Sequence, residues 1–159
     1  MSWRAIPTVA LGAVLALMSC SWSPTWQTTA IGKTSFEDAW TAVEDIAAID
    51  GYPIDHAGTD RGLRVLRTKW RQRVMGFRGS ERKRIHAEFD QGEEGEWFVR
   101  LCVERQNVPD MAKSADPEEE DWKSAGQDAE TEQRLVAKLN MRFWGSPTRA
   151  GGSSSDGSR

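Results

Sequence analysis

The chain has 159 residues, a formal net charge of -3 at pH 7 and a hydrophobic content of 38%. This length fits one modest domain rather than several. Cys20 and Cys102 are the only cysteines, which excludes a network of disulfides. Stability therefore has to come from a packed core, to which the eight tryptophans can contribute large buried areas.

The first nineteen residues are predicted to be an export signal. Arg4 and the amino terminus form a short cationic region, and residues 6–18 are apolar or small apart from Pro7 and Thr8. This run is shorter than the roughly 20 residues that a transmembrane helix needs. An uncleaved anchor and an ordinary cleaved secretory signal are the alternatives to a lipoprotein signal, although the segment does not end in an Ala-x-Ala-like site.

Leu17-Met18-Ser19-Cys20 ends the run and resembles the lipobox of bacterial lipoprotein precursors. The resemblance implies cleavage before Cys20, attachment of diacylglycerol to its thiol, and acylation of the new amino group, for example with palmitate. Such chains would anchor the protein in a membrane, because each buried CH₂ contributes about 0.8 kcal/mol. Ser21 stands where the family's inner-membrane retention signal has Asp, which implies an outer-membrane location facing the periplasm.

Residues 20–33 are predicted to be a lipidated tether, because the stretch is polar and contains Pro24 and Gly32. Trp22 and Trp26 either rest in the membrane interface or pack on the domain. The domain proper is predicted at 34–144. It begins with a helix that Thr34 or Ser35 caps and that Gly51 ends, since apolar residues between them recur at helical spacing.

Strands are predicted next, because apolar side chains alternate with polar ones. The first covers 63–70, with Leu66, Thr68 and Trp70 on one face. The second and third cover 82–90 and 97–106 and are joined by a turn at 92–95. A short extended piece at 52–56 would make a fourth strand. The inward residues of the second and third strands are Ile85, Ala87, Phe89, Trp97, Val99, Leu101 and Val103.

Residues 109–127 are acidic and poor in apolar side chains, which predicts an exposed loop. A second helix is predicted from Asp128 to about Phe143, and the Gly- and Ser-rich tail at 145–159 is predicted to be disordered. The order of elements predicts an α+β domain. Its antiparallel sheet of three to four strands would carry both the N-terminal and the C-terminal helix on one face.

The segment from the capped helix through Gly51-Tyr52-Pro53 to the strand with Thr68 and Trp70 is similar to small envelope lipoprotein domains. In the lipoprotein subunits of the outer-membrane β-barrel assembly machinery, a helix likewise precedes an antiparallel sheet. The similarity covers less than a third of the chain, so it implies a fold class and no functional residue.

Charged residues are segregated: Glu81 is the only acid between residues 61 and 84, whereas residues 90–121 are mainly acidic. The basic strands are therefore a candidate surface for an anionic lipid, an anionic envelope polymer or an acidic envelope protein. The alternative is a solvated face that Glu88, Glu96 and Glu104 neutralise. No nucleic-acid partner is expected for an envelope-anchored chain. The candidate residues are Arg64, Arg67, Lys69, Arg71, Arg73, Arg82 and Arg84.

No catalytic, cofactor or metal site is predicted. The chain contains no GxSxG, phosphate loop or dinucleotide fingerprint. The residues with metal-binding side chains lack the tight spacing of zinc ligands. These residues are Asp55, His56, Asp60, His86 and Cys102.

These observations favour a non-catalytic interaction or assembly module of the envelope. A second hypothesis is a binder of a small or polymeric ligand in a groove between helices and sheet, with an apolar pocket lined by Trp40, Trp70 and Trp97. A third is a hydrolase in which Cys102 is the nucleophile and His86 the base, because the two residues lie on adjacent predicted strands.

Overall fold

A computed structural model describes residues 24–76, 79–110 and 118–145. Six strands form one antiparallel sheet, and two helices pack on one of its faces, so the predicted α+β class is confirmed with a larger sheet than expected. The elements in chain order are β1 (Gln27–Gly32), α1 (Phe36–Ile49), β2 (Val65–Arg67), β3 (Arg71–Val74), β4 (Ser80–Gln91), β5 (Trp97–Val108), the short 3₁₀ helix η2 (Glu119–Asp121), β6 (Lys123–Gln127) and α2 (Ala129–Trp144).

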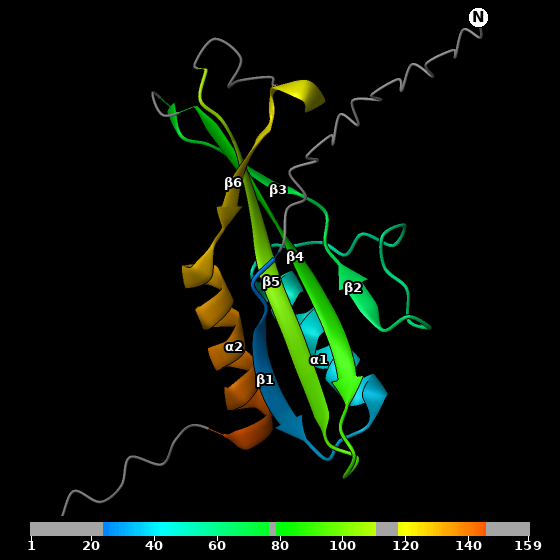
Figure 1. Ribbon diagram of the computed structural model, residues 1–159. Coiled ribbons are helices and arrows are strands. Elements are labelled where there is room, and N and C mark those ends of the chain that lie inside the picture. The colour runs from blue at the N-terminus through cyan, green and yellow to red at the C-terminus, as the bar shows by residue number, and fades with distance from the viewer. Residues whose placement is uncertain (1–23, 77–78, 111–117, 146–159) are drawn as a thin grey trace, which may run out of the picture.

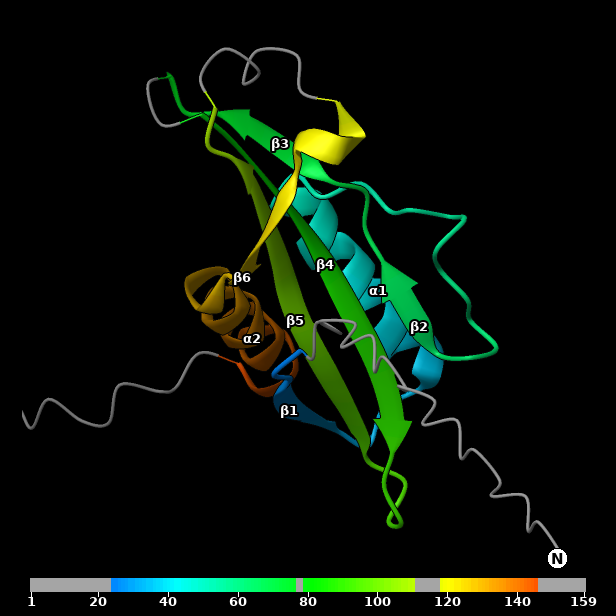
Figure 2. The same ribbon diagram turned by 45° about the horizontal axis from the view of Figure 1, so that its top comes forward.

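The sheet is built around the hairpin of β4 and β5. These two strands of twelve residues pair without interruption from Ser80 opposite Val108 to Gln91 opposite Trp97. On the β4 side they are flanked by β2 and β3, and on the β5 side by β1 and β6. Figure 1 shows that the open end of the hairpin, with β3 and η2, extends beyond both helices. Figure 2 shows α1 behind β4 and β5, so the opposite face of the hairpin is not covered by this helix.

The core lies between the helices and the inner face of the hairpin. All seven predicted inward residues of β4 and β5 are buried, as are Leu135 and Leu139 of α2. Trp40 of α1 is fully buried and stacks on Phe89 with ring centroids 5.1 Å apart. One cluster contains residues of both helices and of the sheet, so the helices cover the same face.

Both helices form where the sequence predicts them. The Ser35 side chain caps α1 by accepting a hydrogen bond from the Asp38 backbone N–H, and Gly51 follows its end with φ of 77°. The Asp128 side chain caps α2 by accepting from the backbone N–H of Thr131. No helix in the described segments is long and apolar enough to cross a membrane.

The predicted tether at 20–33 is corrected, because Gln27–Gly32 forms strand β1. This strand was missed because only Thr29 and Ile31 face the core, and its main contribution is backbone pairing with β5. Trp26 is half-buried with Arg100 5.8 Å from its ring, so it packs on the domain. The signal at 1–19, residues 20–23 of the tether and residues 146–159 of the tail lie outside the described residues.

Two further predictions are corrected. The acidic segment 109–127 is not a loop throughout: η2 and the edge strand β6 occupy its second part, and residues 111–117 lie outside the described residues. The predicted strand at 63–70 is interrupted after Arg67. Between the pairs Arg67–His86 and Arg71–Lys83 the chain has one more residue than β4, and this shift turns Trp70 to the outer face.

The side chain of Glu132 attaches α2 to β5 between the first residue of β1 and the last residue of β6. Along β5, the partner of Leu101 is Gln27 of β1 and the partner of Glu104 is Gln127 of β6. The backbone N–H of Val103 lies in this gap and donates instead to Glu132 Oε1 at 2.8 Å. Glu132 is 2% exposed. Its carboxylate supplies the acceptor that a neighbouring strand would otherwise provide to the buried backbone N–H of Val103.

Replacing Glu132 with Ala is predicted to lower the free energy of unfolding by about 1–3 kcal/mol, because the buried N–H of Val103 loses its acceptor. Glu132→Gln keeps an acceptor oxygen and is expected to cost less. Urea unfolding measures both changes. The neighbouring exposed residue provides the control Gln133→Ala, and equal costs for Glu132→Ala and Gln133→Ala would contradict the bridging role.

Candidate functional site

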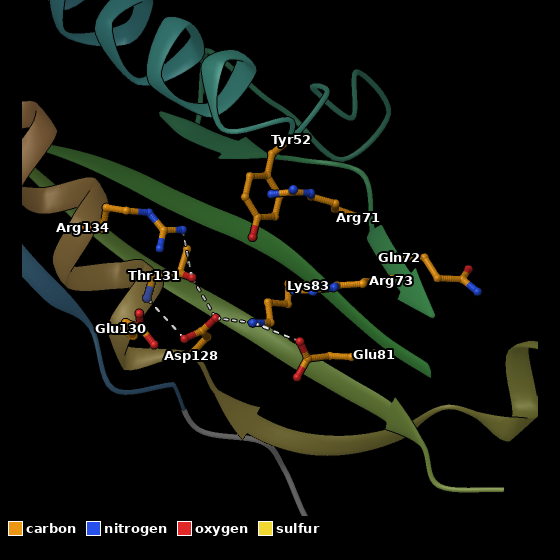
Figure 3. Close-up of a pocket in the computed structure, with 10 residues that line it drawn as sticks. All are labelled: Tyr52, Arg71, Gln72, Arg73, Glu81, Lys83, Asp128, Glu130, Thr131 and Arg134. Atoms are coloured by element: carbon orange, nitrogen blue, oxygen red, sulfur yellow. Dashed lines mark hydrogen bonds and ion pairs between the residues drawn. The ribbon is translucent and has the colours of Figure 1, made fainter. Parts of the chain in front are cut away.

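A polar cleft of about 500 Å³ opens at the end of the sheet that the helices do not cover. It lies between the loop after α1, strands β3 and β4, and the first turns of α2 (Figure 3). Seven of its ten lining residues carry a charge. The lining residues, which define the polar cleft, are Tyr52, Arg71, Gln72, Arg73, Glu81, Lys83, Asp128, Glu130, Thr131 and Arg134.

The position of Lys83 and Glu81 in the cleft follows from the alternation of β4. Ile85, Ala87 and Phe89 face the helices, and the same period of two places Lys83 and Glu81 on that face. These two positions lie beyond the covered part of the hairpin. Beyond the helices, the inner face of β4 therefore carries charged side chains, because apolar side chains at these positions would be exposed to water.

Lys83 lies at the centre of a chain of hydrogen bonds. Its Nζ is 2.6 Å from Asp128 Oδ2 and 3.0 Å from Glu81 Oε1. The same Asp128 oxygen accepts from the Thr131 hydroxyl at 2.7 Å, and Arg134 donates to that hydroxyl at 3.2 Å. Figure 3 shows these contacts as a continuous series from Arg134 of α2 to Glu81 of β4. The contacts tie the beginning of α2 to β4.

The pKa values of Lys83 and Asp128 reflect this pairing. Burial alone would lower the pKa of Lys83, but hydrogen bonds to Asp128 and Glu81 outweigh burial and raise it. Burial alone would raise the pKa of Asp128, but hydrogen bonds from Lys83 and Thr131 outweigh burial and lower it. Both groups are therefore charged at neutral pH and neutralise each other.

Tyr52 and Arg71 form the wall next to α1. Tyr52 is buried except toward the cleft, and burial raises the pKa of its phenol, which Arg71 partly offsets. The Arg71 guanidinium lies 5.4 Å from the Tyr52 ring and donates to the backbone carbonyl of Asp50 at 2.7 Å. A cation at this carbonyl also stabilises the C-terminal end of α1. The phenol stays protonated at neutral pH and remains a hydrogen-bond donor.

Of the seven predicted basic residues, the structure brings only Arg71 and Arg73 together in the cleft. Arg64 lies at the other end of the inner face, with its guanidinium 5.0 Å from the Trp97 ring. Arg67 lies opposite His86 of β4 on the outer face, and Lys69, two residues further along the chain, is exposed. The predicted set is therefore not one continuous surface.

Arg82 and Arg84 have structural partners on the outer face of the sheet. Arg82 is 7% exposed, lies between the rings of Trp70 and Trp122, and donates to both carboxylate oxygens of Glu119 at 2.7 and 2.5 Å. Arg84 lies 4.2 Å from the Trp70 ring and donates to Glu104 at 2.7 Å. Both guanidiniums are engaged within the chain and are poor candidates for binding a partner.

Sequence reasoning missed Tyr52, Asp128, Thr131 and Arg134 as cleft residues. Tyr52 follows the end of α1, and the other three lie at the start of α2, so only the tertiary fold brings them to β3 and β4. The inward position of Lys83 was available as a signal, because it lies two residues before Ile85 in an alternating strand.

The predicted tryptophan-lined pocket is wrong. Trp40 and Trp97 are packed in the core, whereas Trp70 lies on the outer face. The apolar space between helices and sheet measures about 10 Å³, which is no more than one water molecule needs. A ligand therefore has no room between the helices and the covered part of the sheet.

The Cys102–His86 pair does not have the properties of a nucleophile and base. The two residues lie opposite each other on β5 and β4, but Cys102 is fully buried, and burial raises the pKa of its thiol to about 12. His86 Nε2 lies 3.2 Å from Glu104 Oε2. Burial alone would raise the pKa of Glu104, but hydrogen bonds from His86 and Arg84 lower it. A thiol that stays protonated is a weak nucleophile.

Within residues 24–76, 79–110 and 118–145, no group of three or more His, Cys, Asp or Glu side chains is placed to hold a metal ion. Asp55 and Asp60 accept hydrogen bonds from the backbone of the loop before β2. The sequence matches no protein-family model. A search of curated proteins finds no similar sequence.

The ion pair of Lys83 and Asp128 predicts a pH dependence of stability. The pKa of Asp128 is lowered below 3.8, so its contribution is fully present above pH 3.8 and is lost as the pH falls through the folded pKa. The pKa of Lys83 is raised above 10.5, so its contribution is lost as the pH rises through that higher pKa. Between these limits both groups stabilise the fold.

Asp128→Asn tests this dependence, because Asn is an equally good helix cap but has no charge. At pH 7 we expect the variant to be less stable than the wild type by about 1–2 kcal/mol. The difference should shrink as the pH falls below 3.8, because Asp128 of the wild type then becomes protonated. Urea unfolding from pH 7 to pH 2.5 measures it, and a constant difference over this range would contradict the pairing.

Proposed function

We propose that this protein is a lipid-anchored, non-catalytic interaction module of the bacterial cell envelope that binds an envelope partner through the polar cleft. Its anchor is the lipid on Cys20, in the outer membrane and facing the periplasm. The observation that carries the binding role is the cleft itself, which gathers Arg71 and Arg73 with Lys83 and Arg134 on an open end of the sheet. The other basic residues of β4 are engaged within the chain.

The start of the described chain supports a domain that is held near the membrane. The backbone N–H of Thr25 donates to the Gln127 side chain at 2.7 Å, and the Thr25 carbonyl accepts from it at 2.8 Å. Five peptide units separate Cys20 from Thr25 and span at most about 18 Å. A lipid on Cys20 would therefore keep Thr25, and the part of the domain to which it is bonded, within this distance of the membrane surface.

The non-catalytic role is supported by the state of the candidate nucleophile. Cys102 is buried and its thiol is protonated at neutral pH, so it cannot attack a substrate that enters from solvent. The charged residues of the cleft that would act as acid or base, Lys83 and Asp128, are paired with each other.

A second candidate function is the binding of a small or polymeric envelope ligand in the same cleft. The cleft volume of about 500 Å³ favours it, because ligand pockets commonly measure 300–1,000 Å³. Both functions use the same side chains and differ in the size of the molecule that is bound.

A pull-down from detergent-solubilised envelope tests the proposed function. The double variant Arg71→Ser/Arg73→Ser is expected to recover at least about fivefold less partner than the wild type, since each lost charge-assisted hydrogen bond costs about 1.5–3 kcal/mol. Arg64→Ser/Arg67→Ser removes the same charge outside the cleft and is expected to recover the partner normally. In the same cells, Cys20→Ser should move the protein out of the membrane fraction.

Equal recovery of the partner by wild type and both double variants would contradict binding through the cleft. A Cys20→Ser variant that stays in the membrane fraction with unchanged mass would contradict the lipid anchor. The two results are independent, so the anchor and the binding surface are tested separately.

A further inference from the structure

The charges of the polar cleft do not cancel once its internal pairs are counted. Lys83 contacts both Asp128 and Glu81, so this group of three carries a net charge of -1. Arg71, Arg73 and Arg134 stand against that charge and the exposed carboxylate of Glu130, so the lining keeps an excess of one positive charge. Arg134 also lies 3.7 Å from the Asp50 carboxylate, which leaves Arg71 and Arg73 as the cations of the excess. Within the described residues, no ion pair or hydrogen bond engages the Arg73 guanidinium, and Arg71 uses one of its donors for the Asp50 carbonyl. The unused donors are available to an anion that enters the cleft.

The remaining groups of the cleft suit a carboxylate better than a phosphate. A guanidinium can donate two parallel hydrogen bonds to either group. However, Glu81, Asp128 and Glu130 also line the cleft, and a phosphate carrying a charge of about -1.5 to -2 is repelled by them more strongly than a carboxylate of charge -1. The Tyr52 phenol faces the same space and can donate to a carboxylate oxygen.

Strand β3 supplies a place for the rest of a peptide. All four of its residues are exposed, and it pairs with β4 along one edge, while no described strand pairs with the other. An unpaired edge offers backbone N–H and C=O groups to an extended peptide. Arg71 and Arg73 project from this strand into the cleft, so a peptide that pairs with β3 would bring its end to the two guanidiniums.

We propose that the polar cleft binds the C-terminal carboxylate of a peptide through Arg71 and Arg73. The peptide lies along β3, and the Tyr52 hydroxyl donates to the same carboxylate. This inference rests on the proposed function and specifies the chemistry of the partner: an envelope polypeptide or peptide with a free C-terminus.

Tyr52 provides a direct probe, because it is the only tyrosine of the chain. Protein that is purified in detergent and carries ¹³C-labelled tyrosine gives ring NMR signals from the cleft alone. The probes are N-acetyl-trialanine with a free carboxylate, its C-terminal amide, and inorganic phosphate. We expect the free acid to shift the Tyr52 signals saturably and the amide to bind at least about tenfold more weakly, which corresponds to one lost charge-assisted contact.

Two matched variants locate the binding. Arg73→Ser should weaken binding of the free acid about tenfold, because the variant lacks a guanidinium that would donate to the carboxylate. Lys69→Ser removes an exposed cation outside the cleft and should change the affinity by less than about twofold, since solvent and salt screen its charge.

Equal binding of acid and amide would overturn the proposal, as would phosphate binding as tightly as the acid or the absence of any saturable shift. These failures are distinguishable from failure of the proposed function. If the pull-down still depends on Arg71 and Arg73 when the free acid gives no shift, the cleft binds its partner through another chemical group. If the pull-down is independent of both arginines as well, the cleft is not the binding surface.

Discussion

The β4–β5 hairpin is much longer than the helices that cover it, and the arrangement of the molecule depends on this difference. Twelve paired residues span about 40 Å, whereas α1 with 14 residues and α2 with 16 residues span about 21 and 24 Å. Where the helices cover the inner face, β4 carries Ile85, Ala87 and Phe89. Where they end, the same face carries Lys83 and Glu81, and the polar cleft opens.

The distribution of arginines follows from the same geometry. Neither α1 nor α2 covers the outer face of the hairpin, and within the described residues polar and aromatic side chains pack there in place of an apolar layer. Arg82 between Trp70 and Trp122, with both its terminal nitrogens on Glu119, belongs to this layer. A basic stretch in the sequence thus divides into arginines that hold the fold and arginines that face solvent in the cleft.

The helices and the central hairpin were predictable from sequence because their signals are local. Caps at Ser35 and Asp128 and helical or alternating spacing of apolar residues define them. Edge strands β1 and β6 were missed, since they are held by backbone pairing with few buried side chains. One extra residue between β2 and β3 reversed the face of Trp70, and periodicity alone does not reveal such a shift.

The candidate site was predictable only in part, for a related reason. Arg71 and Arg73 were expected within a larger basic surface, but Tyr52 joins them from the loop after α1 and Arg134 from α2. Tyr52 and Arg134 reach the cleft because α1 ends, and α2 begins, beside strands β3 and β4. The Asp50 side chain contributes to this arrangement, because it pairs with Lys138 and approaches Arg134 of α2.

Site-specific photo-crosslinking in the cell tests most directly whether the uncovered end of the sheet is the binding surface. A photoreactive residue at Glu130, which is exposed in the first turn of α2, reports on the polar cleft. The control carries the photoreactive residue in place of Met141. This exposed position lies eleven residues, or about 16 Å, further along the helix. We predict that an envelope protein is crosslinked at position 130 and not at position 141. Crosslinking at 141 alone, or equally at both positions, would contradict the account.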